Sequence, residues 1–251
     1  MKILVTFAVH AEFAAWRRNG QFREVTRQPF PLYLGEVGGS SVRVLLTGIG
    51  NESAAEAIRW GLTAVTDLCI SSGFAGALRS DLCVSELLAA RVVCRAGREL
   101  AVASDRHLFA SACEVGARPV DRFMTTRHLV VSAEEKAILS GEADAVEMES
   151  YEVLAEAARR GVRAVSIRAV SDSASASLPF DFDRMRDQRG AIRRKLLLRE
   201  LLRKPQRLGA LLRLARDCRM ASAQLAEFLG RYVQMLDAGF DRSESAMAAA
   251  I

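Results

Sequence analysis

The chain has 251 residues, of which 50% are hydrophobic and 26% are charged, with a formal net charge of +5. A chain of this size and composition can bury a substantial core and falls in the range of one large α/β domain. No run approaches the ~18 apolar residues that a membrane span needs, and the apolar run at residues 3–9 lacks the length and cleavage site of a signal peptide. We therefore expect a cytoplasmic protein.

The five cysteines are widely spaced, mostly within apolar segments, and none forms a CxxC pair. Such a set favours a reducing compartment and core positions over zinc binding or redox chemistry. The histidines also lack the spacing of metal ligands. The sequence thus predicts no metal and no other cofactor.

Seven short segments are rich in β-branched residues or leucine, as the strands of a buried sheet are. In chain order they are residues 2–9, 42–49, 68–73, 84–94, 128–131, 143–148 and 162–170. Helices are predicted between them. One begins with Asn51 as N-cap, a second begins at Ser132 with a capping box completed by Glu135, and a third spans residues 149–160 before Gly161.

This alternation favours a three-layer α/β/α fold with a central mixed sheet. After residue 172 the composition of the sequence changes. A loop rich in Ser and Ala is followed by a helical tail with a break near Pro205. We expect a single domain, with a core at residues 1–178 and a basic helical extension at residues 179–251, which we interpret as an appendage.

Three acids stand at predicted strand ends, where α/β sheets bind their ligands. Glu12 follows the first strand, Glu149 lies where a strand turns into a helix, and Asp172 ends the last predicted strand. Position alone is equally compatible with helix-capping or solvated acids. The sequence around each acid says more about its role than its position does.

The run Val-Glu-Met-Glu-Ser at residues 146–150 and the run Ile-Arg-Ala-Val-Ser-Asp at residues 167–172 resemble the paired signature of the nucleoside phosphorylase and nucleosidase superfamily. Residues 1–12, 47–50 and 72–78 resemble further blocks of that superfamily in the same order. The resemblance implies the nucleoside phosphorylase-like fold, a purine nucleoside as small-molecule partner, and a homodimer.

The resemblance also implies roles for individual residues. The first signature would hold the ribose through Glu149 and Met148, and the second, with Ser171 and Asp172, would hold the purine. Three further assignments are weaker, and the role of Met148 has an alternative. Phe74 either lines the base pocket or packs in the core. Leu129 and Val130 match a region whose backbone meets the purine edge. Met148 is equally compatible with a position in the core.

Two reaction classes remain open. Phosphorylases need cationic partners for the phosphate dianion, and those that resemble this chain place an arginine and a serine where Ser71 and Phe74 stand here. Glu12 matches the water-activating glutamate of methylthioadenosine/adenosylhomocysteine nucleosidases, which favours hydrolysis. Arg17 and Arg18 keep the phosphate-dependent alternative open.

In the hydrolytic reading, Glu12 activates water and Asp172, protonated because it is buried, donates to the leaving purine. His10 lies on the same side of an extended segment as Glu12 and either orients it or is structural. A catalytically dead binding module would have lost an acid at position 12 or 172, and neither is lost.

Residues 184–219 hold 13 Lys/Arg and three acids, a local charge of +10, so the rest of the chain carries −5. Within this segment, leucines repeat at helical spacing: Leu197, Leu198, Leu201, Leu202, Leu208, Leu211 and Leu212. Such helices either lie on an anionic membrane or dock on their own domain. Nucleic-acid binding is disfavoured because aromatic residues are not interleaved.

This tail also looks like that of the hopanoid-associated branch of the superfamily, on the run Arg-Lys-Pro at residues 203–205 and the leucine-arginine run at residues 211–217. The Gly-Phe-Ala-Gly turn at residues 73–76 fits that branch as well. The resemblance implies release of adenine from a 5′-substituted adenosine, with adenosylhopane, a lipid nucleoside, as the particular substrate.

Overall fold

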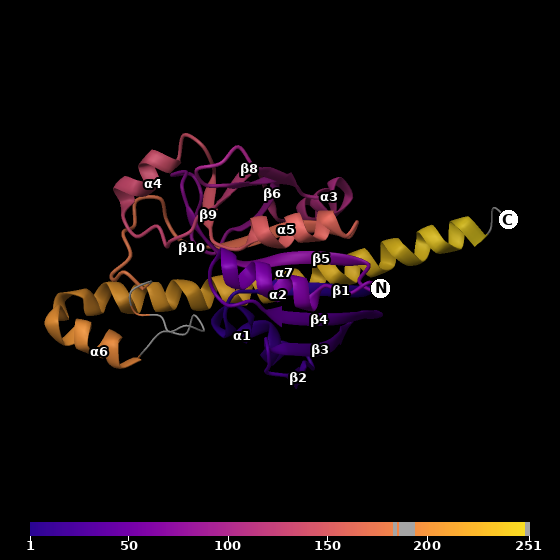
Figure 1. The fold of residues 1–251 in the computed structure, drawn as a ribbon, viewed down its shortest axis with the longest axis horizontal. Coiled ribbons are helices and arrows are strands. Elements are labelled where there is room, and N and C mark those ends of the chain that lie inside the picture. Colours follow the sequence, from indigo (N-terminus) through magenta and orange to yellow (C-terminus); the bar gives the residue numbers. More distant parts are fainter. Residues whose placement is uncertain (183–184, 186–193, 249–251) are drawn as a thin grey trace.

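The computed structural model describes residues 1–182, 185 and 194–248, and in it a mixed β-sheet lies between two layers of helices (Figure 1). The strands are β1 (Lys2–Phe7), β2 (Arg23–Thr26), β3 (Leu32–Val37), β4 (Ser40–Leu46), β5 (Leu68–Ala77), β6 (Leu87–Arg95), β7 (Ala101–Ala103), β8 (Arg118–Thr125), β9 (Ala145–Glu147) and β10 (Arg163–Asp172). The helices are α1 (His10–Asn19), α2 (Asn51–Gly61), α3 (Arg106–Val115), α4 (Ala133–Leu139), α5 (Ser150–Arg159), α6 (Arg194–Arg203), the 3₁₀ turn η2 (Pro205–Arg207) and α7 (Leu208–Ala248).

The sheet closes on itself at one side. Strand β1 is parallel to β4 and β5, and β10 is parallel to β5 but antiparallel to β6. Because β8 and β9 complete the circuit from β6 back to β5, the strands β5, β10, β6, β8 and β9 pair in a ring. The order β1, β4, β3, β2 extends from this ring as an open sheet.

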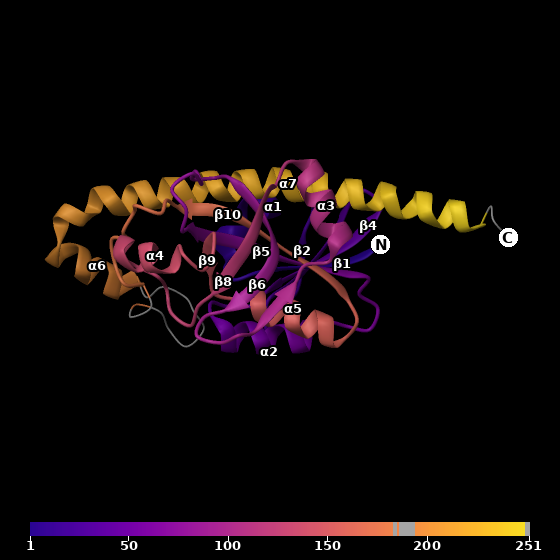
Figure 2. The same ribbon diagram turned by 90° about the horizontal axis from the view of Figure 1, so that it is seen from above.

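Helices cover both faces, as the predicted three-layer fold requires. Helices α1 and α3 pack against α7 on one face, and α2 packs against α5 on the other. Figure 2 shows the sheet between these layers, with α7 running along one face from end to end.

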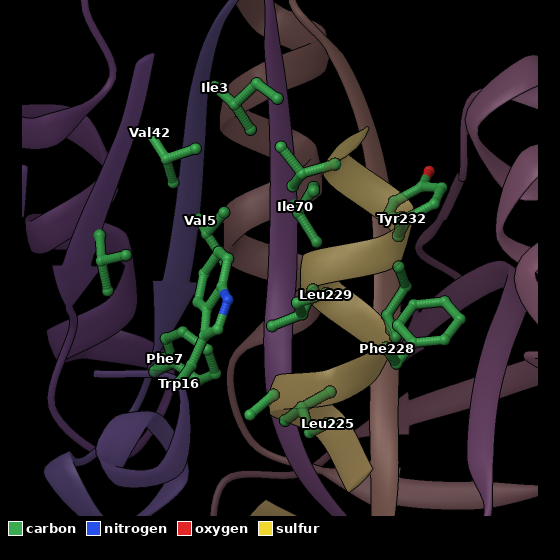
Figure 3. Packing of buried hydrophobic residues seen from close by; sticks show 14 of the residues in the cluster. Ile3, Val5, Phe7, Trp16, Val42, Ile70, Leu225, Phe228, Leu229 and Tyr232 are labelled. Carbon is green, nitrogen blue, oxygen red and sulfur yellow. The ribbon is translucent and has the colours of Figure 1, made fainter. Parts of the chain in front are cut away.

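The long helix α7 carries part of the main hydrophobic core. Its middle section buries side chains against β10, β5 and α1 (Figure 3); they are Ala221, Leu225, Ala226, Phe228, Leu229, Tyr232 and Val233. Each large apolar side chain buried in this way contributes about 1.5–3 kcal/mol. The interpretation of the tail as an appendage is therefore wrong for this section.

Six of the seven predicted strands are confirmed with shifted ends, and the seventh, at residues 128–131, is wrong. There the Thr126 hydroxyl donates to the His128 carbonyl, a local turn that competes with strand pairing. The sequence pattern did not predict β2, β3, β7 or β8, nor the helices α1 and α3.

The predicted helix starts are partly confirmed. Gly50, not Asn51, is the N-cap of α2, with a φ of 95°. Ser132 caps α4 by accepting from the backbone N–H of Glu135, but the Glu135 carboxylate pairs with His128 instead of completing a capping box. Helix α5 ends as predicted, with Gly161 at a φ of 69°.

No helix in the described part of the chain is long and apolar enough to cross a membrane. All five cysteines are free. Cys69 is buried, as expected for a core position, but Cys83 is exposed, so the prediction of core cysteines fails there.

Candidate active site

A cavity of about 280 Å³ lies beside the C-terminal ends of β1, β5 and β10, the edge at which α/β sheets bind their ligands. It is lined by all eight site residues that the sequence predicted: Glu12, Phe74, Leu129, Val130, Met148, Glu149, Ser171 and Asp172. They come from five separate segments of the chain, so the fold brings together residues that are distant in sequence.

Glu12 lies buried in the first turn of α1. Its Oε2 accepts hydrogen bonds from the backbone N–H groups of Ala8 (2.7 Å) and Val9 (3.1 Å), and its Oε1 accepts from that of Phe74 (2.8 Å). Burial raises the pKa of Glu12, while Arg168 and these donors oppose the rise. Glu12 thus caps α1, as the alternative interpretation held, and also presents a fixed carboxyl group to the cavity.

Glu149 lies at the N-cap position of α5, but its side chain does not cap that helix. Its Oε1 accepts a hydrogen bond from the backbone N–H of Gly50 at 2.8 Å. Burial and the neighbouring charge of Glu147 raise the pKa of Glu149 to about 8. At neutral pH this carboxyl group therefore holds its proton in the folded protein.

Glu147, which lines the cavity, forms a buried ion pair with Arg168 that the sequence pattern did not predict. Arg168 Nη2 lies 2.7 Å from Glu147 Oε2, which also accepts from the backbone N–H groups that start α5. Burial acts to raise the pKa of Glu147, but Arg168 and the hydroxyl of Thr125 outweigh it, so the pKa is lowered. The only signals in sequence were an acid within the first signature and an arginine within the second.

Asp172 ends β10 after an irregularity in the pairing with β5. Such a bulge explains why the consecutive residues Ser171 and Asp172 both face the cavity, since neighbours in a regular strand point to opposite sides. The Ser171 hydroxyl donates to Asp172 Oδ1 at 2.6 Å, and Lys136 Nζ donates to Asp172 Oδ2. We expected a carboxyl group protonated because of its burial. Its surroundings instead include an ammonium group.

The apolar predicted residues surround these acids. Met148 and Val130 are buried, and Phe74 is half-buried and also packs against the main core. The side chain of Phe74 therefore both lines the cavity and packs in the core, so the two roles weighed for it do not exclude each other.

Four further lining residues come from the C-terminal part of the chain: Leu178, Phe182, Leu214 and Cys218. Burial raises the pKa of the Cys218 thiol to about 12. Leu214 and Cys218 lie one turn apart on α7. The tail therefore closes one side of the cavity, which the sequence pattern had not indicated.

Three residues weighed from the sequence lie outside the cavity lining. His10 is the first residue of α1, not part of an extended segment, and its ring packs edge-on against Tyr33 with centroids 6.1 Å apart. Burial and Arg17 lower the pKa of His10. Arg17 lies over the Tyr33 ring, and Arg17 and Arg18 are both exposed.

Within the described ranges, no lysine or arginine lines the cavity, and no group of three metal-binding side chains occurs. The Ser71 hydroxyl is bonded to Ser150 and Arg168 in the interior. The cavity is thus an apolar pocket with four acids on its wall: Glu12, Glu147, Glu149 and Asp172.

A second, more open depression of about 540 Å³ lies between the β5–β6 loop and α7. Its charged side chains pair with one another, Arg118 with both Asp81 and Glu86. We assign it no role.

The closed ring of strands with buried acids at its edge defines an α/β protein with a largely apolar pocket that carries four acids. A family model described as the phosphorylase superfamily matches residues 2–203. The chain belongs to that superfamily.

Solved structures share this fold. Futalosine hydrolase of Helicobacter pylori, in a mutant form, is 19% identical with a TM-score of 0.73, covering 94% of this chain and 99% of that one. The 5′-methylthioadenosine/S-adenosylhomocysteine nucleosidase of Neisseria meningitidis, bound to methylthio-immucillin-A, is 22% identical with a TM-score of 0.71, covering 93% and 99%. No curated protein matches.

Proposed function

We propose that the protein hydrolyses the N-glycosidic bond of a purine nucleoside. The observation that carries the proposal is the meeting of Glu12, Glu149 and Asp172 on one cavity with no cationic side chain among its described lining residues. A phosphate dianion would need charge-assisted partners there. Water needs only a base, and Glu12 is the buried acid best held for that task.

In the proposed reaction, the oxygen of a water molecule forms a bond to C1′ as the bond from C1′ to the purine nitrogen breaks. Glu12 takes a proton from the water, and the bonding electron pair leaves with the purine, which receives a proton at N7 from Asp172. The sugar passes through an oxocarbenium-like state, which negative charge on Glu12 favours. Glu149, which holds its proton at neutral pH, donates a hydrogen bond to one ribose hydroxyl and accepts one from the other, and so fixes the ring.

The alternative is a phosphate-dependent phosphorylase, and release of free purine in phosphate-free buffer separates the two. We expect full activity without phosphate. Strict dependence on phosphate would assign the chain to the phosphorylases, and binding without turnover would make it a nucleoside-binding module.

For the substrate, we propose a 5′-substituted adenosine with a large apolar 5′ group, adenosylhopane being the particular candidate from the sequence resemblance. Support comes from the apolar wall that Leu178, Phe182 and Leu214 add to the acids. The Neisseria meningitidis protein with this fold is named as a nucleosidase for 5′-methylthioadenosine and S-adenosylhomocysteine, and a Helicobacter pylori protein with this fold, in a mutant form, holds 5′-methylthioadenosine in its active site. A 5′-methylthioadenosine/S-adenosylhomocysteine nucleosidase activity is the competing assignment.

The test compares adenine release from adenosines with 5′ groups of increasing apolar size, in detergent, with release from methylthioadenosine. Leu214→Gln should lower kcat/KM for the large apolar substrates and leave methylthioadenosine nearly unaffected. A clear preference of the wild-type protein for the small substrate would remove the lipid proposal.

We further propose that α6, η2 and the first turns of α7 rest on an anionic membrane. These elements project beyond the sheet (Figure 1). They expose Leu202 (76%) and Leu212 (60%) beside the basic side chains of Arg203, Lys204 and Arg216. Leu208 and Leu212 lie one turn apart on an exposed face of α7, whereas Leu214 faces the cavity, so a helix that rests on lipid through the exposed face would lie between the membrane and the pocket.

Flotation with vesicles of anionic and of neutral lipid tests this contact. We expect binding to anionic vesicles that weakens with salt, and a loss of binding in Leu202→Ser/Leu212→Ser. Equal binding to both vesicle types, or none, would reject it, and co-migration with nucleic acid would point to a different partner. The homodimer and the cytoplasmic location remain proposals from the sequence, and the mass of the protein in solution checks the first.

A further inference from the structure

Lys136 is a lysine buried so completely that its side chain has no exposed surface. It lies in the middle of the short helix α4, and its ammonium group donates to Asp172 Oδ2, to the carbonyl of Ser173 (2.8 Å) and to that of Ala176 (3.0 Å). All three ammonium protons are therefore used. A buried charge of this kind is costly unless it is paired and bonded, so its position needs an explanation.

Hydrogen bonds near Lys136 join the α4 region to the segment that follows Asp172. The backbone N–H of Ala133 donates to the Ser177 hydroxyl, and the N–H of Leu178 donates to the carbonyl of Val131. Gly76 leaves room for the pair, because a Cβ there would lie 3.1 Å from Asp172 Oδ2 and 3.6 Å from Lys136 Cε. Lys136 thus joins the exit of β10, the following loop and α4 at one point.

Lys136 does not line the cavity, whereas Asp172 does. Its only ionic contact in the described structure is with Asp172 Oδ2. An oxygen that faces an ammonium group is the unfavourable place for a proton. A proton on Asp172 is therefore carried by Oδ1, the oxygen that Ser171 contacts.

We infer that Lys136 is a positioning residue for Asp172, which holds Oδ2 in place and so selects Oδ1 as the atom that exchanges a proton with the leaving purine. This inference rests on the proposed hydrolysis. It assigns Lys136 no contact with the substrate and no covalent step. Lys136 acts by fixing the direction in which Asp172 donates.

The test uses two substrates with the same 5′ group, an adenine nucleoside and a 4-nitrophenyl riboside, whose leaving group departs without protonation. For Lys136→Met we expect kcat on the adenine nucleoside to fall by about 100-fold, the scale of a misplaced reacting group. We expect kcat on the nitrophenyl riboside to stay close to wild type. Lys2→Met, which makes the same change at an exposed lysine, should alter neither rate.

Lys136→Gln and Lys136→Arg keep hydrogen-bond donors and cover the case in which Lys136→Met does not fold. Lys136→Arg, which keeps the charge, should recover part of the adenine rate. In Asp172→Asn, adding Lys136→Met should cost little more. This non-additivity is expected for residues that act as a unit.

Equal losses on both substrates in the folded variants would show a purely structural lysine, and unchanged adenine rates would overturn the inference. If Asp172→Asn itself fails to discriminate between the substrates, the acid assignment in the proposed function fails instead. If the wild-type protein releases no purine, the proposed function fails before Lys136 is in question.

Discussion

The carboxyl group of Glu12 rests directly against the backbone of Gly73. A Cβ atom at position 73 would lie 2.7 Å from Glu12 Oε1, and the φ of Gly73 is 149°. No ordinary side chain fits at this distance, and the backbone conformation favours glycine. Gly73 thus gives Glu12 its place between α1 and β5.

We expect Gly73→Ala to displace Glu12 and to lower kcat by about 100-fold, since small displacements of a reacting group have large effects. Gly97→Ala is the matched control, because Gly97 has a φ of 70° but nothing within 4 Å of its Cβ position. Both variants carry backbone strain, and Gly73→Ala adds a steric clash, so thermal melts should show the larger loss of stability for Gly73→Ala, while circular dichroism should show that both variants are folded at the assay temperature. Only Gly73→Ala should lose turnover, and equal rates in the two variants would contradict this reading.

Glu12→Gln and Asp172→Asn should each lower turnover by about 10²–10⁴-fold, the range for loss of a general base or acid. Both changes preserve shape, and the fold should survive. Steady-state purine release and thermal melts check the two parts. Near-normal rates in either variant would remove that residue from the mechanism.

Stability should depend on pH through Glu149. Its ordinary pKa is 4.5, and the folded protein raises it to about 8, so between these values the folded state holds a proton that the unfolded state has released. The resulting stabilisation is complete below pH 4.5 and is lost as the pH rises through 8.

Melting temperatures of wild type and Glu149→Gln across pH 5 to 9 test this dependence. The variant carries no charge at position 149 and should lose less stability as the pH rises. Glu52→Gln, on an exposed position of α2, is the control and should follow the wild-type curve. Parallel curves for wild type and Glu149→Gln would show that Glu149 is not the group responsible for the pH dependence of stability.

Breaking the buried pair of Glu147 and Arg168 should be severe. Arg168→Met leaves the Glu147 carboxylate uncompensated in the interior, which costs about 3–5 kcal/mol of unfolding free energy. Urea unfolding measures the loss. Arg159→Met, which breaks an exposed pair with Glu156, should leave the unfolding free energy nearly unchanged, and equal effects of the two would contradict the role of burial.

The sequence predicted Glu12, Glu149 and Asp172 because they stand at strand ends within recognisable runs, but it did not predict Glu147. It did not predict Lys136, since a lone lysine in a short helix looks like a solvated charge until the loop after Asp172 folds over it. Residues 128–131 looked like a strand because their local apolar content hid the turn at Thr126. β8 was missed because charged residues on its exposed face interrupt its apolar pattern.

One helix serves two purposes in this protein. Leu214 and Cys218 of α7 face the cavity, and from Ala221 onward the same helix fills the core. Substitutions that reshape the pocket on this side also shift the register and tilt of a helix on which folding depends. Substrate range and thermal stability should therefore change together in evolution. Engineering one of them should require further substitutions that restore the other.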